Sequence, residues 1–181
     1  MKFSEKLRIE TKSTHLIVDK HPFVNLIKTN PKAGYLYMQF NKISVLELQK
    51  NILSKNELPF SKFNYKILEK DIDLELINIP YFKLFLERCN KHYLEHFYMI
   101  QLGLLFGGNM LKKILPENEK DFFDIEGLSE KGRLELIKEF KNYLDNTIID
   151  ITDQNNFIKI VNDSYLIIKH IFDEYFNMIS I

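Results

Sequence analysis

The sequence contains one cysteine, no tryptophan, and no excess of charge of either sign. A lone cysteine excludes an internal disulfide and suits a reducing compartment. The 25 basic and 25 acidic residues balance, so no overall charge favours nucleic acid or an anionic membrane as a partner. The first residues lack the apolar core of a signal peptide, and no uncharged apolar run is long enough to span a bilayer. We therefore expect a soluble, cytoplasmic protein without a membrane anchor.

The alternation of apolar and polar residues that is typical of strands is also lacking, whereas helical spacing runs through most of the chain. At 181 residues one hydrophobic core suffices, and no repeat or linker divides the chain. The sequence thus predicts an all-α helical bundle, a single domain over residues 1–181, with Ser4 as its first helix cap. We predict helices over about 5–20, 35–53, 61–70, 80–89, 90–115, 129–147 and 153–178.

Glycine is scarce, yet three of the six glycines fall in one apolar helical stretch, YMIQLGLLFGGNMLKKIL. They are Gly103, Gly107 and Gly108. Each glycine inside a helix costs about 1 kcal/mol relative to alanine, so some other interaction must offset the loss. Close approach of another backbone, a kink, or a flat ligand lying on the helix would each provide that offset.

A second informative stretch is LRIETKSTH near the N-terminus. On one helix Arg8, Lys12, His15 and Asp19 would be spaced i, i+4, i+7 and i+11, and would share one stripe. Asp19 could accept the Nδ1 proton of His15 and leave Nε2 free for a metal. The stripe could therefore hold a metal cofactor with acidic side groups. The alternative is a solvated helix face with one incidental histidine.

Together these stretches resemble a known family. The pattern LRxxTKxxH, with a carboxylate four residues later, and the pattern YxxxLGxLxGGxxLKKI resemble the heme oxygenases, and SYLIIKHIFDEY is similar to their aromatic-rich final helix. The resemblance implies one all-α domain in which heme is sandwiched between a proximal and a distal helix. It further implies His15 as the proximal iron ligand, with Asp19 at the place of a family glutamate.

The resemblance also assigns the remaining pocket positions. Arg8 and Lys12 would meet the heme propionates, and the backbone of Gly103 and Gly107 would contact the porphyrin as the catalytic distal helix. Further cofactor-binding positions follow from the same motifs, although each aromatic residue among them could equally be a plain core residue: Tyr98, Leu104, Gly108, Lys141, Tyr165 and Phe172.

The chain departs from the family on the distal side. Leu104 stands where the family has an aspartate that holds a water network, and Ile100, Phe106 and Ile168 replace an arginine, a serine and an asparagine. Family members open heme with O₂ and electrons from a reductase or ferredoxin, and release biliverdin, iron and CO. Because losing one positioned hydrogen-bonding group can cost about 10²–10³ in rate, we expect turnover here to be slow or absent. The alternatives are a non-catalytic heme-binding or heme-sensing protein and a heme-free scaffold.

A second metal pattern competes with this one. HYLEH, at 92–96, reads as H-x-x-E-H, which resembles the zinc motif of inverted zinc peptidases. No partnered downstream glutamate is identifiable, so we favour a solvated helix face for both histidines. Glu69, Asp71 and Asp73 are interpreted as a charged connecting segment, and Cys89 as a small buried residue rather than a nucleophile.

Overall fold

The regular elements in the described part of this chain are helices. The computed structural model describes residues 1–55, 65, 67, 69–115, 122 and 128–180. Within these ranges the chain forms helices and turns and no strand, so the predicted all-α class is confirmed. Over the same ranges, every helix is too short or too polar to cross a lipid bilayer.

The helix predicted over 5–20 is divided in two. Helix α1 (Phe3–Glu10) is followed by α2 (Lys12–Asp19), and Thr11 lies between them with φ −101° and ψ −4°. The buried Thr11 hydroxyl donates a hydrogen bond to the Leu7 carbonyl at 2.8 Å, and such back-bonding by threonine bends helices. Arg8 therefore lies on a different helix from Lys12 and His15.

The predicted N-cap at Ser4 is wrong. Helix α1 has Lys2 at its N-cap, and the Ser4 side chain lies within the first turn. The backbone N–H of Ser4 donates to Asp145 at 2.7 Å, and its hydroxyl donates to the same carboxylate at 3.1 Å. A carboxylate from a distant helix thus satisfies the free donors at this helix start, which local sequence could not reveal.

The middle of the chain joins short elements to one long helix. The helix predicted over 61–70 lies largely outside the described residues. The elements in order are α3 (Pro22–Leu26), α4 (Pro31–Lys55), the 3₁₀ turns η2 (Glu69–Asp71) and η3 (Leu74–Asn78), and α5 (Pro80–Lys91).

The glycine-containing helix predicted over 90–115 consists of three consecutive segments. Helix α6 (Tyr93–Phe97) leads into a π-helical turn, η4 (Tyr98–Leu102), and then into α7 (Gly103–Leu111). Its start is delayed because His92, with φ −129° and ψ 56°, breaks the helix after α5. A wide π turn directly before Gly103 supplies a local distortion at the first glycine.

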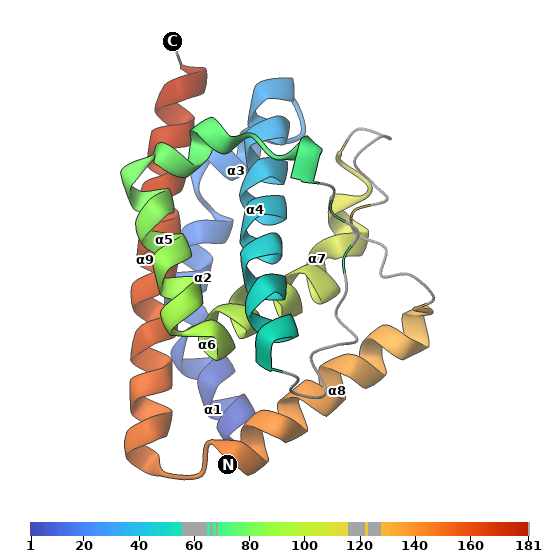
Figure 1. The fold of residues 1–181 in the computed structure, drawn as a ribbon, viewed down its shortest axis with the longest axis vertical. Coiled ribbons are helices and arrows are strands. Elements are labelled where there is room, and N and C mark those ends of the chain that lie inside the picture. The colour runs from blue at the N-terminus through green and yellow to red at the C-terminus, as the bar shows by residue number, and fades with distance from the viewer. Residues whose placement is uncertain (56–64, 66, 68, 116–121, 123–127, 181) are drawn as a thin grey trace.

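The last two helices match their predicted extents closely. Helix α8 (Glu130–Thr147) starts at Ser129, whose hydroxyl accepts a hydrogen bond from Gly132 N–H, and α9 (Ile151–Ile179) starts at Asp150. Figure 1 shows α9 along one side of the molecule, next to α5, with α8 crossing below on the other side. Helix α9 packs against both α2 and α5.

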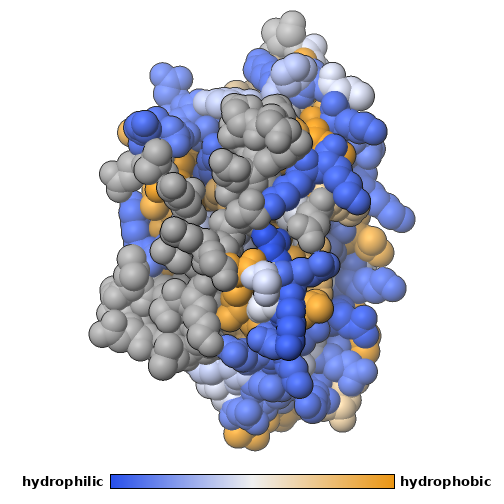
Figure 2. All heavy atoms as spheres, turned by 90° about the vertical axis from the view of Figure 1, so that its right-hand side faces the viewer, coloured by the Kyte–Doolittle hydropathy of each residue, from blue (hydrophilic) through white to orange (hydrophobic). Residues whose placement is uncertain are grey.

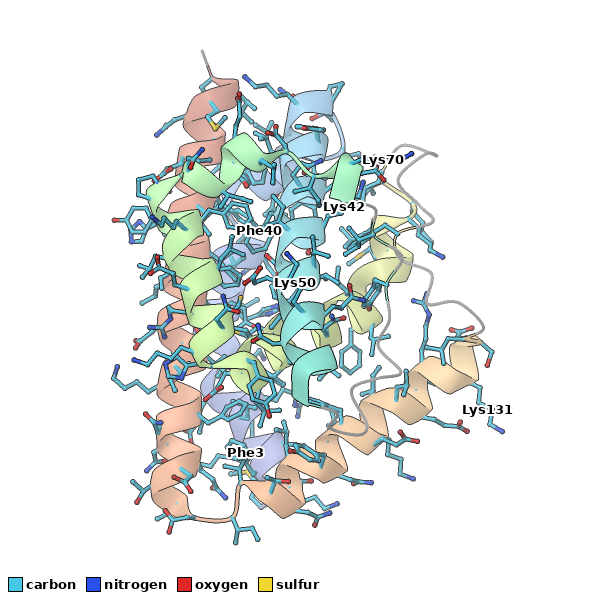
Figure 3. All side chains as sticks on the ribbon, viewed as in Figure 1. Phe3, Phe40, Lys42, Lys50, Lys70 and Lys131 are labelled. Carbon is cyan, nitrogen blue, oxygen red and sulfur yellow. The ribbon has the colours of Figure 1, made fainter. Side chains whose placement is uncertain are left out.

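Aromatic side chains fill much of the core. Phe40 of α4 packs with its ring centroid 5.5 Å from that of Phe82 and 5.6 Å from that of Phe172, and Figure 3 shows it between α4 and α5. Phe3 of α1 makes an edge contact with Phe157 of α9 at 5.4 Å. These contacts fix α1, α4 and α9 relative to one another, and thereby position α2.

Candidate functional site

Two helical glycines of α7 face open space. Beyond its chain neighbours and the backbone of its own helix, a Cβ atom built on Gly103 or on Gly107 would meet no atom of the described residues within 4 Å. Close packing of another described helix therefore does not explain these glycines. A flat ligand, or the adjacent π turn, remains as the feature that would compensate for the helix stability lost at each glycine. A helix face that is open at two glycines fits a planar group such as a porphyrin.

The open face is bordered by exposed apolar side chains. Phe106 is 58% exposed and Met110 is 69% exposed. With Gly103 and Gly107 they follow the spacing i, i+3, i+4 and i+7, which defines one face of a helix. The family motif did not single out Met110, although this spacing alone could have identified it. Exposed apolar area around an open surface is typical of a ligand site.

His15 lies on α2 with its ring accessible. Its side chain is 47% exposed, and Nδ1 lies 3.2 Å from Asp19 Oδ2, as the sequence predicted. The ring of Tyr165 on α9 makes an edge contact with the imidazole, with centroids 5.1 Å apart. Two neighbours thus orient the ring, and the contact at Nδ1 leaves Nε2 available to a metal.

Two tyrosines, Tyr165 beside His15 and Tyr98 in the π turn that precedes α7, lie close together. Burial raises the pKa of Tyr165, and the nearby groups of Tyr98 and Asp19 raise it further. Burial also raises the pKa of Tyr98, while a hydrogen bond with the Thr11 side chain and the charge of Arg8 lower it. Helices α2 and α9 and the π turn therefore meet around these phenols.

The three predicted propionate-binding cations lie in separate helices. Arg8 and Lys12 are exposed on α1 and α2. Lys141 belongs to α8, and its Nζ lies 5.4 Å from the ring centroid of Phe106 on α7. The structure thus brings Lys141 to the edge of the glycine face. A lysine at the border of an open surface suits a ligand that carries carboxylates.

Three of the four predicted apolar replacements are buried, and Phe106 is the exposed one. Leu104, Ile100 and Ile168 all belong to the hydrophobic core. Gln101, in the π turn, is also fully buried, and among the described residues neither its amide nitrogen nor its amide oxygen finds a hydrogen-bond partner. Sequence reasoning missed Gln101, because the family pattern gives no reason to expect a buried amide there.

Two further predicted positions lie in the interior. Gly108 is buried on α7, so it does not share the open face of Gly103 and Gly107. Phe172 is buried among other aromatic rings, including Phe23 and Phe40. Phe172 thus has the core role that the sequence left open.

The histidines of the alternative zinc pattern belong to no three-ligand cluster among the described residues. His96 is fully buried against Phe85, so the expectation of a solvated face is wrong for this residue. Its Nδ1 lies 2.7 Å from the His92 carbonyl, and burial lowers its pKa to about 4. Within the described part of the chain, no cluster of three or more His, Cys, Asp and Glu side chains could hold a metal ion. Cys89 is buried as predicted, and burial raises the pKa of its thiol, so it is not activated.

Two cavities among the described residues are lined by neither His15 nor Gly103 nor Gly107. One, of about 410 Å³, is lined by residues of α4 and the 3₁₀ turns, including Tyr35, Lys42 and Asp73. The other, of about 330 Å³, lies between the start of α1 and helix α8 and includes Lys2 and Lys141.

The arrangement as a whole is that of a heme-oxygenase-like helical fold. Among solved structures, the chain is similar to heme oxygenase-1 from the cyanobacterium Synechocystis sp. PCC6803 in complex with heme, with 16% identity and a TM-score of 0.79 over 99% of this chain and 96% of that chain. It is also similar to heme oxygenase from Leptospira interrogans, with 15% identity and a TM-score of 0.74 over 96% of this chain and 100% of that chain.

A third similar structure is heme oxygenase-2 from Synechocystis sp. PCC 6803 in complex with heme and NO. It has 16% identity and a TM-score of 0.75, over 99% of this chain and 87% of that chain. No protein-family model and no curated protein sequence matches the chain. At this level of identity the likeness establishes the fold, and the fold predicted from the two sequence motifs is confirmed.

Proposed function

We propose that this protein binds heme between α2 and α7, with His15 as the iron ligand. The observation that carries the proposal is the pair Gly103 and Gly107, because a methyl group on either residue would meet no atom of the described residues within 4 Å beyond its chain neighbours and the backbone of its own helix. Support comes from the accessible imidazole of His15, backed by Asp19. Two of the similar structures contain heme, which agrees with this choice of ligand.

Each part of the site has a separate task in this proposal. His15 would bind iron through Nε2, because Asp19 engages Nδ1. Arg8, Lys12 and Lys141 would pair with the propionates at the open edge. When bound, heme would supply an iron centre that can bind O₂ and accept electrons from a reductase or ferredoxin.

The distal residues argue against efficient turnover. Turnover would require polar groups of the chain near α7 to hold a water that delivers a proton. Leu104, Ile100 and Ile168 are apolar and buried, so their side chains offer no hydrogen bond. Holding such a water would then fall to backbone groups of the glycine face. We therefore propose that conversion of heme to biliverdin is slow or absent.

This observation also favours a second candidate function. A protein that binds heme without degrading it, as a store, carrier or sensor, needs the imidazole, the cations and the glycine face, but no distal polar network. The chain has the imidazole, the cations and the glycine face, but it has no polar side chain at the three buried positions Leu104, Ile100 and Ile168. A scaffold that binds no heme would have no need of open glycines in α7, which cost stability.

A titration with hemin followed by a turnover assay tests both statements. We expect a Soret band that saturates at about one equivalent of hemin. With ascorbate, or with a reductase and O₂, the band should persist, and chromatography should detect little biliverdin over time. Absence of binding at micromolar hemin would contradict the first statement, and rapid stoichiometric biliverdin would contradict the second.

A further inference from the structure

Phe106 stands at the border of the open face of α7. It follows Gly103 by three residues and precedes Gly107 by one, so its side chain projects about 60° around the helix from the Cα position of Gly103. The ring is 58% exposed, and it therefore contributes little to the core. An aromatic ring held at the edge of a ligand face requires an explanation other than folding.

The ring contacts a cation that belongs to another helix. Nζ of Lys141 on α8 lies 5.4 Å from the ring centroid, within the range of a cation–π interaction. Helices α7 and α8 lie on the same side of the molecule in Figure 1. Figure 2, which views that side, shows apolar surface bordered by polar side chains.

Lys141 also belongs to a basic region. It lines the cavity between α1 and α8 together with Lys2 and Lys138. A lysine side chain has several rotatable bonds, and so it places its ammonium group poorly unless a neighbour restricts it. Phe106 supplies that restriction at the border of the glycine face.

We propose that Phe106 is a positioning residue for Lys141. The ring holds the ammonium group beside the glycine face, so that the edge of the porphyrin that carries the carboxylates lies toward α8. This inference rests on the proposed heme binding. It assigns a role to the replacement of serine by phenylalanine, because a serine side chain could not make the same contact.

Binding of hemin and of hemin dimethyl ester, which lacks free carboxylates, tests the inference. We expect Phe106→Leu and Lys141→Met each to weaken hemin binding about two- to fivefold, in line with a cation–π contact at an exposed site. Both changes remove the same contact. The double variant should therefore bind hemin no more weakly than the single variant with the lower affinity. Affinity for the dimethyl ester should not change in any of them.

Two further variants serve as controls. Phe106→Tyr keeps a ring face for Lys141, so it should bind hemin like the parent protein. Lys138→Met removes an equal charge one turn earlier on α8, and its effect should add to that of Phe106→Leu. Circular dichroism should report unchanged helix content throughout, because the ring of Phe106 is largely exposed.

The outcomes separate the two proposals. Additive losses for Phe106→Leu and Lys141→Met, or equal losses for hemin and its dimethyl ester, would overturn the positioning role while heme binding by the parent protein stands. If the parent protein itself fails to bind hemin, then the proposed function falls, and the positioning role falls with it.

Discussion

The carboxylate of Asp19 lies 3.2 Å from Nδ1 of His15, one helical turn away on α2. In metal sites, such a partner fixes the ring and increases its basicity, and its loss typically costs 10- to 100-fold in metal affinity. Both side chains are about half exposed, so we expect the loss of affinity here to be about tenfold, the lower end of that range.

Replacing Asp19 tests this role. Asp19→Ala should weaken hemin binding by about tenfold, because the ring loses its partner at Nδ1. Asp19→Asn should bind nearly as well as the parent protein, since the amide oxygen still accepts a hydrogen bond. Soret titrations give both dissociation constants. Equal affinities for the alanine variant and the parent protein would show that Asp19 does not orient the ligand.

Charge reversal on α1 and α2 tests the orientation of the ligand. Arg8→Glu combined with Lys12→Glu should weaken hemin binding several-fold, and more strongly at low ionic strength, because both groups are exposed and screened by salt. Lys83→Glu combined with Lys91→Glu makes the same change in net charge on α5 and should have little effect. Equal losses for the two double variants would indicate a response to net charge rather than contact with propionates.

The buried His96 predicts a loss of stability in acid. Burial lowers its pKa from 6.5 to about 4, so the unfolded state binds a proton more readily than the folded state. The contribution to stability is thus complete above about pH 6.5 and is lost as the pH falls toward 4, by up to about 3 kcal/mol. Urea unfolding at pH 7 and at pH 4.5 measures this dependence.

A variant isolates the histidine in that measurement. His96→Gln keeps a donor for the His92 carbonyl but does not titrate, so its free energy of unfolding should change less between the two pH values. His170→Gln, a control at a half-exposed position, should keep the parent's dependence. An unchanged pH dependence in His96→Gln would place the acid sensitivity in other groups.

The burial of Leu104 predicts the effect of placing an aspartate at this position. Leu104→Asp would place an unpaired carboxylate in the core, which costs several kcal/mol at pH 7. Burial raises the pKa of such a group, so the loss should shrink as the pH falls toward 4 and the carboxyl group takes up a proton. Thermal unfolding of Leu104→Asp and of the uncharged Leu104→Asn checks this expectation, and equal stability of Leu104→Asp and the parent would contradict it.

The sequence predicted those features that depend on spacing within one helix. The helices over 129–147 and 153–178, the proximity of His15 and Asp19, and the unusual glycines of α7 all follow from local periodicity. The fold followed from two motifs in the correct order. These features are local because side chains three or four residues apart on a helix are neighbours.

Contacts between distant segments could not be predicted in this way. Asp145 holds the start of α1, Tyr98 meets Thr11, and Lys141 lies over Phe106. Each of these pairs joins helices whose relative positions depend on the packing of the whole core. The π turn before Gly103 is likewise set by packing, since nothing in its residues distinguishes it from a regular helix.

Ligation of heme iron by His15 is the proposal on which the others depend, and the spectrum of the hemin complex is its sharpest test. His170 provides a matched control: its side chain is 46% exposed and lies near Asp173, much as that of His15 is 47% exposed and lies near Asp19. Absorption and resonance Raman spectra should be compared for the parent protein, His15→Ala and His170→Ala, each with one equivalent of hemin. We predict an imidazole-ligated spectrum for the parent and for His170→Ala, its loss in His15→Ala, and its recovery when free imidazole is added. An unchanged spectrum in His15→Ala would contradict the assignment of His15 as the ligand.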